Sequence, residues 1–319
     1  MTVAAECPVG LQSVDRVDVT IVVDNFVDLL MAGDEGVRRY AATDLGGREQ
    51  LVAEHGFSAL ITVESDGRSN SVLYDGGLTP GALARNLDIL QVPVKDLRAL
   101  VVSHGHADHH GGLEALFTRY GRRGLPLVIH PEAWRERKLV FPTGTELQLP
   151  PPNRRDLEAE GVDVIETPGQ TLLLDSTVLV SGQVERVTSF ERGFPIHHAR
   201  SPAGWEPDPM IWDDQNLIVN VNDKGLVIVS GCSHSGAVNV LRNAQRLTGE
   251  QRVAGFIGGL HLTGGIFEPI ITPTVDALVA AGIQRLLPAH CTGWKAVHQL
   301  AQALPDAFVQ PAVGTVITF

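Results

Sequence analysis

The chain has 319 residues, of which 44% are hydrophobic and 19% charged, and this composition excludes a disordered protein. Its formal net charge of −12 at pH 7 argues against nucleic acid or an anionic membrane surface as the main partner. The 3 cysteines, Cys7, Cys232 and Cys291, are too few for a disulfide framework, and no stretch approaches the roughly 20 apolar residues of a membrane span.

The first half of the chain alternates short apolar runs with turn residues. These runs predict strands at residues 17–23, 59–63, 72–74, 97–102 and 125–129, the second and third joined as a hairpin. Apolar side chains at helical spacing predict helices at residues 80–90 and 112–120.

The second half repeats this order. Strands are predicted at residues 217–221, 226–230, 253–257 and 285–287, and residues 316–319 close the chain. Helices are predicted at residues 238–247, 272–281 and 293–304. Each half could supply one sheet covered by helices on one face, so we expect an α/β fold in which two sheets pack together as a four-layer αββα sandwich.

Between the two halves, the alternation of predicted strands and helices becomes irregular. We expect a single domain over residues 1–319 with an irregular lid or insert at about residues 131–214. A long irregular segment in a compact domain usually has a function, and this one is expected to hold the substrate specificity.

The largest cluster of potential metal-ligating side chains follows the predicted strand at residues 97–102. Of the 12 histidines, four lie between positions 104 and 110. His104 and His106 are two residues apart, a spacing that puts both rings on one side of an extended backbone. Asp108 and His109 follow where the chain turns into a helix, and imidazole with carboxylate is a donor set for zinc, iron or manganese. We therefore predict a metal site here.

The pattern His104-x-His106-x-Asp108-His109-x-Gly111-Gly112 resembles the signature of the metallo-β-lactamase superfamily. Further segments resemble its branch named after dihydropterin-ribofuranosylaminobenzene phosphate synthase, at residues 22–25, 54–58, 73–77, 190–192, 213–215, 230–236, 258–262 and 288–293. The resemblance implies the αββα fold and one or two metal ions at the sheet edge.

The remaining metal ligands should follow later strands. His234 is the candidate third ligand of the first metal, and His290 is the candidate for the second. The superfamily normally places a bridging Asp after the late hairpin, whereas this chain has Cys232 there. Cys232 could ligate as a thiolate or be a small buried residue, and Asp214, just before the hairpin, is an alternative ligand.

Other residues are expected around the metals. His261 follows two glycines and could bind substrate or shuttle a proton. Asp24 or Asp75 could accept a hydrogen bond from a metal-bound imidazole. His197 and His198, in the expected lid, are candidates for substrate binding.

These residues predict a metal-dependent hydrolase. Two divalent ions, zinc first with manganese or iron as alternatives, would hold a hydroxide that attacks the substrate. The expected substrate is a small phosphoester or phosphorylated heterocycle, ahead of an amide or a lactone. Asp108 would ligate one ion and orient the nucleophile, and His261 could protonate the leaving oxygen.

Three alternatives stay open. The branch name implies a dihydropterin-type transferase that displaces diphosphate. The fold also hosts iron enzymes, and a mononuclear iron dioxygenase is harder to exclude than a flavodiiron protein, which usually has Glu where this chain has His106. A non-catalytic ligand-binding protein of the same fold is the third.

The expected partner is a small-molecule substrate, with no nucleic acid and no membrane, and a homodimer is an open alternative to a monomer. The N-terminal residues 1–19 are interrupted by charged side chains and do not resemble a signal peptide, so we expect a cytoplasmic protein.

Overall fold

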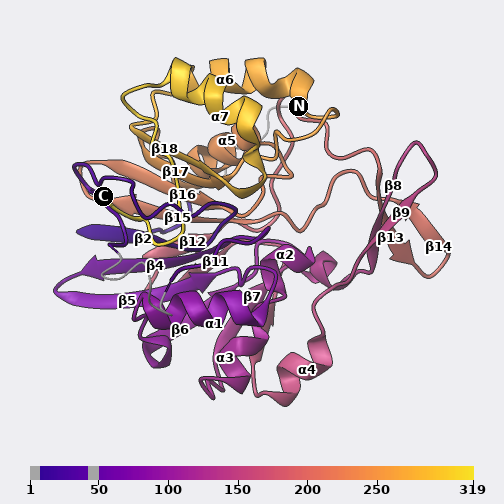
Figure 1. Cartoon of the computed structure of the whole chain (residues 1–319), viewed down its shortest axis with the longest axis horizontal. Coiled ribbons are helices and arrows are strands. Elements are labelled where there is room, and N and C mark those ends of the chain that lie inside the picture. Colours follow the sequence, from indigo (N-terminus) through magenta and orange to yellow (C-terminus); the bar gives the residue numbers. More distant parts are fainter. Residues whose placement is uncertain (1–7, 42–49) are drawn as a thin grey trace.

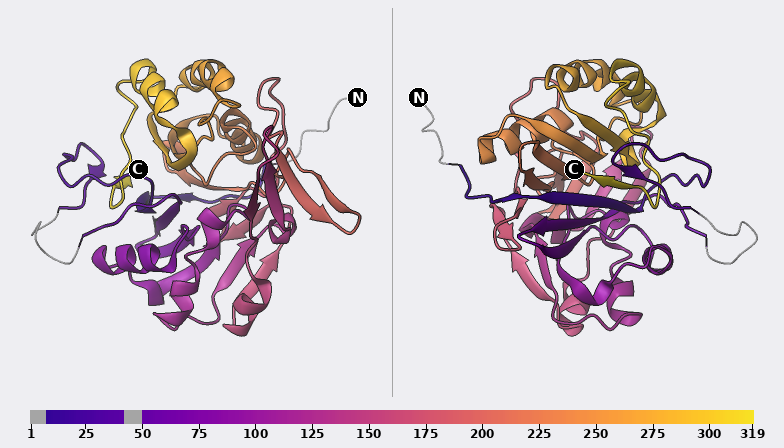
Figure 2. Two further views of the ribbon diagram at one scale, coloured as in Figure 1. Left: turned by 45° about the vertical axis from the view of Figure 1, so that its right-hand side comes forward. Right: turned by 90° about the vertical axis from the view of Figure 1, so that its left-hand side faces the viewer.

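The computed structural model describes residues 8–41 and 50–319, so Cys7 lies outside the described residues. Within these ranges the chain forms two large sheets that pack face to face between helices, and a smaller third sheet that projects from one side (Figures 1 and 2). The predicted αββα sandwich is confirmed.

The first large sheet has the strand order β10-β7-β6-β5-β4-β2-β19-β3. Its strands are β2 (Arg16–Val23), β3 (Val37–Arg38), β4 (Ser58–Ser65), β5 (Arg68–Tyr74), β6 (Leu97–Val101), β7 (Pro126–Ile129), β10 (Asp163–Glu166) and β19 (Val316–Thr318). The predicted hairpin is present as β4 and β5. Its turn is tighter than expected because Asp66 and Gly67 both adopt positive φ, at 51° and 71°, so both strands extend further.

The second large sheet has the order β11-β12-β15-β16-β17-β18, with β1 paired to β15. Its strands are β1 (Ser13–Val14), β11 (Thr171–Leu173), β12 (Val178–Val180), β15 (Asn216–Val221), β16 (Gly225–Ser230), β17 (Val253–Gly259) and β18 (Arg285–Ala289). The predicted strands at residues 217–221, 226–230, 253–257 and 285–287 are therefore all confirmed in this sheet.

Helices cover the outer face of each sheet (Figure 1). The first sheet is covered by α1 (Pro80–Ile89) and α3 (Glu114–Thr118), and the second by α5 (Ala237–Thr248), α6 (Ile271–Ala280) and α7 (Trp294–Ala303). The short helix α2 (Ala107–His110) lies in the loop after β6, and α4 (Arg154–Ala159) lies on the outer side of the first sheet, where Leu157 packs against its apolar cluster. The helix predicted at residues 112–120 is shorter than expected, and α2 forms within the histidine motif itself.

Three apolar layers hold the sandwich together. Along β15 and β16 the side chains alternate, so that Val219 and Val227 point between the sheets while Ile218 and Ile228 point to the helices. The same alternation on β4 places Ile61 between the sheets. This period of two is what a sheet buried on both faces requires, and a slip of one residue would move every side chain to the wrong layer.

The segment at residues 131–214 is more regular than the sequence predicted. It supplies strands to both large sheets and also forms the third sheet, which we call the arm sheet, in the order β14-β13-β8-β9. Its strands are β8 (Arg137–Val140), β9 (Glu146–Leu149), β13 (His197–Ser201) and β14 (Gly204–Pro207). Such strands of four or five residues carry too few alternations to be recognised from sequence.

Among the described residues, no helix has the length and apolar character needed to cross a membrane.

Candidate metal centre

The predicted site residues come together because the strands that precede them run in one direction. β5 pairs with β6 in parallel, and β16, β17 and β18 are parallel to one another. Their carboxyl ends therefore open at one edge of the sandwich, where α/β proteins usually bind ligands. The histidine motif follows β6, and the loops after β16, β17 and β18 carry Cys232, His234, His261 and His290.

A tyrosine joins the two sheets directly beneath this edge. Tyr74, the last residue of β5, donates its hydroxyl to the carbonyl of Gln215 (2.7 Å) and accepts from the amide of Gly231 (3.0 Å). Its ring is fully buried. The loop that carries Cys232 is thereby fixed relative to the first sheet.

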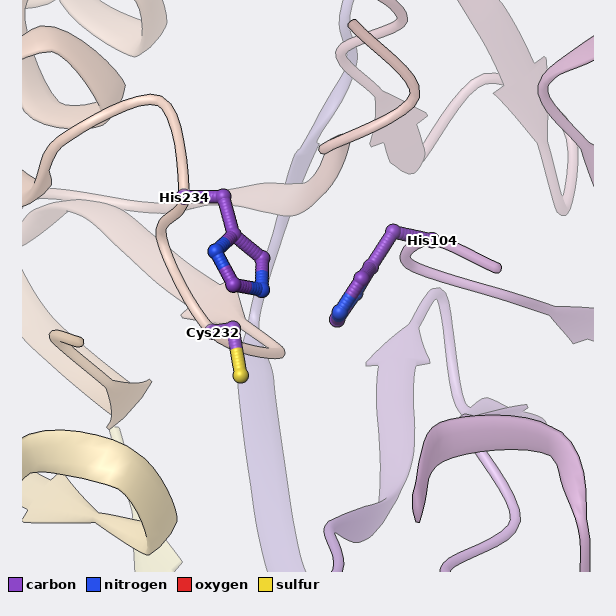
Figure 3. A group of neighbouring side chains, drawn as sticks. All are labelled: His104, Cys232 and His234. Atoms are coloured by element: carbon purple, nitrogen blue, oxygen red, sulfur yellow. The ribbon is translucent and has the colours of Figure 1, made fainter. Parts of the chain in front are cut away.

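His104, Cys232 and His234 form the first group of donors (Figure 3). Their donor atoms all lie within 4.8 Å of one another. Among the described residues, Nε2 of His104 and both ring nitrogens of His234 have no hydrogen-bond partner, although they are buried. Leaving a buried polar atom unpaired costs about 1–3 kcal/mol, so these atoms are expected to meet a ligand.

His109, Cys232 and His290 form the second group. Nδ1 of His109 donates to Oδ2 of Asp75 at 2.7 Å, which turns its Nε2 toward Sγ of Cys232 at 3.2 Å. Asp75 is thus the carboxylate that orients a ligand imidazole. Asp24, the other candidate for that role, instead accepts from the backbone amide of His290 at 2.8 Å.

Asp108 lies among three imidazoles. Its Oδ2 is 3.2 Å from Nε2 of His290, 3.5 Å from that of His55 and 3.7 Å from that of His109. His55, Asp108 and His290 make up a third group of donors. His55, in the segment at residues 54–58 that resembles the branch, was expected beside the metal ligands and not among them.

His106 joins the centre through ring contacts rather than through these groups. Its ring centroid is 4.5 Å from that of His104 and 4.8 Å from that of His234, both edge-on. Its Nε2 is 2.9 Å from Nε2 of His197. The nitrogen left for a metal is therefore Nδ1.

The geometry separates the two alternatives for the additional ligand. Cys232 belongs to three of the four donor groups that the described residues form, whereas Asp214 belongs to none. Asp214 uses Oδ2 to accept from the amide of Ser235 at 2.9 Å and from the Ser235 hydroxyl. Cys232 is therefore the better candidate for a shared donor, and Asp214 holds the loop that carries His234.

The two sides of the centre differ in charge. Burial lowers the pKa of His104, His106 and His234 well below the ordinary value, so these rings are neutral and keep a lone pair for a cation. Burial has the same effect on His109, but Asp108 and Asp75 outweigh it and raise its pKa to about 9. Asp108 is itself buried, yet His109 and His290 hold its pKa below the ordinary value.

His261 lies beside the first group. Its ring centroid is 4.2 Å from that of His234, and it forms a fourth donor group with Cys232 and Cys291. Sγ of Cys291 donates to the carbonyl of Cys232 at 3.5 Å. Nδ1 of His261 is buried without a partner among the described residues.

Several residues at this edge adopt a backbone conformation that L-residues avoid. Asp75, Ser233, His261 and His290 have φ of 59°, 55°, 46° and 49°. Such residues cost roughly 1–3 kcal/mol each and persist where the surrounding structure enforces them, as at functional sites.

A cavity of about 330 Å³ opens beside His234 and His261. Its other walls include Phe190, Arg192 and Phe267. The ring of Phe267 meets that of His261 edge-on at 4.5 Å. A cavity of this size, apolar with a few polar groups, is typical of a small-molecule site.

Three further histidines have other environments. His197 is fully buried, with Nδ1 at 2.9 Å from the carbonyl of Asp208 and Nε2 against His106. His198 is partly buried, and its Nδ1 lies 3.2 Å from the carbonyl of Ile196. His110 points Nε2 toward the carbonyl of Pro150 at 3.3 Å, on the outer side of the motif. The substrate-binding role of His197 and His198 stays a prediction.

The residues present fit divalent metal ions. Among the described residues, buried ring nitrogens of His104 and His234 have no hydrogen-bond partner, and both histidines, like His290, share a donor group with Cys232. Imidazole with thiolate and carboxylate is a donor set for such cations. Two facing sheets with this donor set at their edge define a metal-dependent enzyme of the αββα class.

The chain belongs to the metallo-beta-lactamase superfamily, whose family model matches residues 53–238. It is 29% identical over 275 residues to the 7,8-dihydropterin-6-methyl-4-(beta-D-ribofuranosyl)-aminobenzene-5'-phosphate synthase of Methanocaldococcus jannaschii, covering 84% of this chain and 90% of that protein. An uncharacterised protein of the same organism is 28% identical over 278 residues, with 84% and 95% covered.

Solved structures show the same fold. A metal-dependent hydrolase of the beta-lactamase superfamily superimposes with a TM-score of 0.72 at 21% identity, covering 95% of this chain and 98% of the other. The metallo-beta-lactamase fold protein YhfI from Bacillus subtilis gives a TM-score of 0.52 at 12% identity, with 96% and 100% covered. The resemblance to the superfamily that was read from the sequence is confirmed by the family model, and the 29% identical relative carries the name of the branch.

Proposed function

We propose that this chain is a binuclear metal-dependent hydrolase of a small phosphorylated substrate. The observation that carries the proposal is the pair of donor groups that share Cys232, one with His104 and His234 and one with His109 and His290. A single shared donor between two groups is the arrangement that two neighbouring ions need.

Zinc is the proposed metal, with iron or manganese as alternatives. Sulfur and imidazole donors favour zinc or iron over harder cations such as magnesium. When bound, the ions would activate a water molecule and polarise the substrate oxygen that is attacked. Asp108, at the centre of three imidazoles, would ligate and would orient that water.

His261 is proposed to protonate the leaving oxygen. It lies between the first donor group and the 330 Å³ cavity, and one of its ring nitrogens has no partner within the described chain. A general acid must lie within hydrogen-bond reach of the leaving group, and this position satisfies that condition for a substrate held in the cavity.

The cavity supports a substrate with a ring and an anionic group. Phe190 and Phe267 offer apolar and aromatic surface, and Arg192, a cationic residue, lines the same cavity. Guanidinium pairs well with phosphate oxygens. The proposed partner is accordingly a small phosphorylated molecule, with neither nucleic acid nor a membrane involved.

A second candidate is a synthase that displaces diphosphate. It is favoured by the name of the Methanocaldococcus jannaschii relative, which matches 84% of this chain. The same polarisation of a phosphorylated substrate serves both reactions. They differ in whether water or an amine or carbon nucleophile attacks.

The first test is metal content per chain, by plasma mass spectrometry, on protein purified without added metal, beside His106→Ala. About two equivalents of zinc or manganese in the wild type, reduced in the variant, would support the binuclear centre. One equivalent of iron would put a mononuclear dioxygenase first. No metal after reconstitution would overturn the catalytic proposal and leave a ligand-binding protein.

The second test separates hydrolysis from synthesis. The loaded protein is incubated in ¹⁸O-labelled water with phosphomonoesters, phosphodiesters and diphosphate esters, and products are followed by ³¹P NMR. Label in the product of turnover without any added nucleophile supports the hydrolase. Release of inorganic diphosphate only when an aromatic amine is present supports the synthase.

A further inference from the structure

We propose that the arm sheet supplies the residue that positions His106 as a metal ligand, and that this residue is His197. The inference rests on the proposed role of His106 in the metal centre. His197 lies 91 positions beyond His106 in the sequence, at the start of β13 in the arm sheet, and it is fully buried. Its role is therefore that of a positioning residue, acting through His106.

The hydrogen bonds of His197 fix which of its nitrogens carries the proton. Nδ1 lies 2.9 Å from the carbonyl oxygen of Asp208, which can only accept, so Nδ1 donates. In the neutral imidazole Nε2 then has a free lone pair. This Nε2 lies 2.9 Å from Nε2 of His106.

The tautomer of His197 determines that of His106. With His197 neutral, Nε2 of His106 faces its lone pair at 2.9 Å and donates to it, so Nδ1 of His106 is left unprotonated. That is the nitrogen with which His106 can bind a cation. The opposite tautomer would set two lone pairs against each other and would occupy the ligating atom with a proton. The carbonyl of Asp208 thus selects, through His197, the form of His106 that ligates.

A second contact from the arm sheet holds the backbone between His104 and His106. Arg137, on β8, forms a bidentate ion pair with Asp213, at 2.8 Å and 2.5 Å. Oδ2 of Asp213 accepts from the amide of Gly105 at 2.7 Å, and Gly105 stands between His104 and His106. A side chain at Gly105 would collide with the carbonyl of Ala133 and approach Arg137 Nη1 to 2.8 Å.

Both contacts come from neighbouring strands. β8 and β13 are antiparallel partners, with Arg137 opposite Ala199 and Leu139 opposite His197. The arm sheet that projects from the sandwich in Figure 1 is therefore anchored at the metal centre by two side chains, Arg137 on β8 and His197 on β13. Its placement and the geometry of the His104–His106 segment depend on each other.

The test compares His197→Leu with His197→Gln. Leu keeps an apolar side chain of moderate size but cannot accept from His106. Gln can accept through Oε1 and donate through its amide, so it should restore the selected tautomer. His198→Leu, on the same strand and without a bond to His106, is the matched control. Circular dichroism and thermal unfolding confirm that each variant is folded.

The first readout is zinc affinity, measured by competition with a chromophoric chelator. Loss of an outer hydrogen-bond partner of a ligand histidine typically weakens metal binding by about 10–100-fold. We expect a loss of that size for one zinc equivalent in His197→Leu, a much smaller loss in His197→Gln, and none in His198→Leu. Unchanged affinity in His197→Leu, or an equal loss in His198→Leu, would overturn the inference.

The second readout needs no metal. Ring ¹⁵N shifts in histidine-labelled, metal-free protein identify the tautomer of His106, assigned by the signals missing in His106→Gln. We expect Nε2–H in the wild type and in His197→Gln, and a tautomer mixture in His197→Leu. Nδ1–H in the wild type would refute the inference. A wild type that binds no metal would refute the proposed function, while these shifts would still decide how His197 acts on His106.

Discussion

The two sides of the metal centre use the same residue type in opposite electrostatic states. His104, His106 and His234 pack ring against ring, and burial lowers their pKa well below the ordinary value. On the other side Asp108 and Asp75 contact His109 and raise its pKa to about 9. The imidazoles of the first side can therefore take a cation without losing a proton, whereas His109 on the second side must release one, and the shared thiol of Cys232 must release its own proton to ligate either ion.

Removing Cys232 should disable both sides of the metal centre, because Cys232 is the donor that the two sides share. Cys232→Ala is expected to lose both metal equivalents and all turnover, a larger effect than the roughly 100-fold upper limit for outer partners of a ligand. Metal content and chelator competition measure it. Cys291→Ala is the comparison variant: its thiol belongs to only one of the four donor groups that the described residues form and donates to the Cys232 carbonyl, so it should lose less metal than Cys232→Ala. Retention of both equivalents by Cys232→Ala would show that Cys232 is a packing residue.

His261 sharpens the comparison, because it lies on the side of His234 and faces the cavity. His261→Asn is expected to lower kcat by roughly 10²–10⁴-fold, the usual contribution of a general acid, with metal content unchanged. Steady-state kinetics with a good-leaving-group ester provides the check, since such a substrate needs no protonation and should lose much less. An equal loss with both substrates would contradict the role of proton donor.

The charged side should make the stability of the metal-free protein depend on pH. The pKa of His109 is raised to about 9, so its contribution is complete below about pH 6.5 and is lost as pH rises toward 9. A shift of that size corresponds to at most about 3 kcal/mol. Asp75→Asn should therefore be less stable than the wild type at pH 6.5.

The control is to measure the same stability difference at a pH where His109 is neutral in the folded protein as well. In urea unfolding with a chelator present, the difference between Asp75→Asn and the wild type should shrink between pH 6.5 and pH 9.5. Asparagine tolerates the positive φ of 59° at this position, so the backbone should not be strained by the change. A difference that stays constant over that range would mean that Asp75 acts through packing alone.

The smallest effect is expected at the wall of the cavity. Phe267→Ala removes aromatic surface beside His261 without touching the metal donors, so KM should rise by about 10-fold while kcat changes little. Val187→Ala, at an exposed apolar residue outside the cavity lining, is the control. A fall in kcat with unchanged KM would place Phe267 in the reacting step rather than in binding.

Most of the layered fold was predictable because its strands are long apolar runs bounded by turn residues. β2, β4, β15 and β16 carry six to eight residues each; β2 alternates along most of its length, and β15 and β16 are almost continuously apolar, as strands buried on both faces are. The arm sheet was not predictable. Its strands are short, and β13 begins with His197, whose side-chain partner His106 is distant in sequence.

The candidate site divides in the same way. One loop predicts a set of metal ligands by spacing alone, because local backbone geometry brings its side chains together: His104, His106, Asp108 and His109. The choice between Cys232 and Asp214 could not be made from spacing. Both flank the same hairpin, and only the turn after β16 decides that the thiol faces the centre while the carboxylate faces Ser235.

By itself, the sequence determined the superfamily, the layer order and the donor-rich loops, because these depend on residue type and on local periodicity. Tertiary structure alone decided what each donor meets. It placed Asp75 on His109, Asp108 among three imidazoles and His197 behind His106. The physical reason is that hydrogen-bond partners and charge states depend on distances across the sandwich, which no local pattern in the chain encodes.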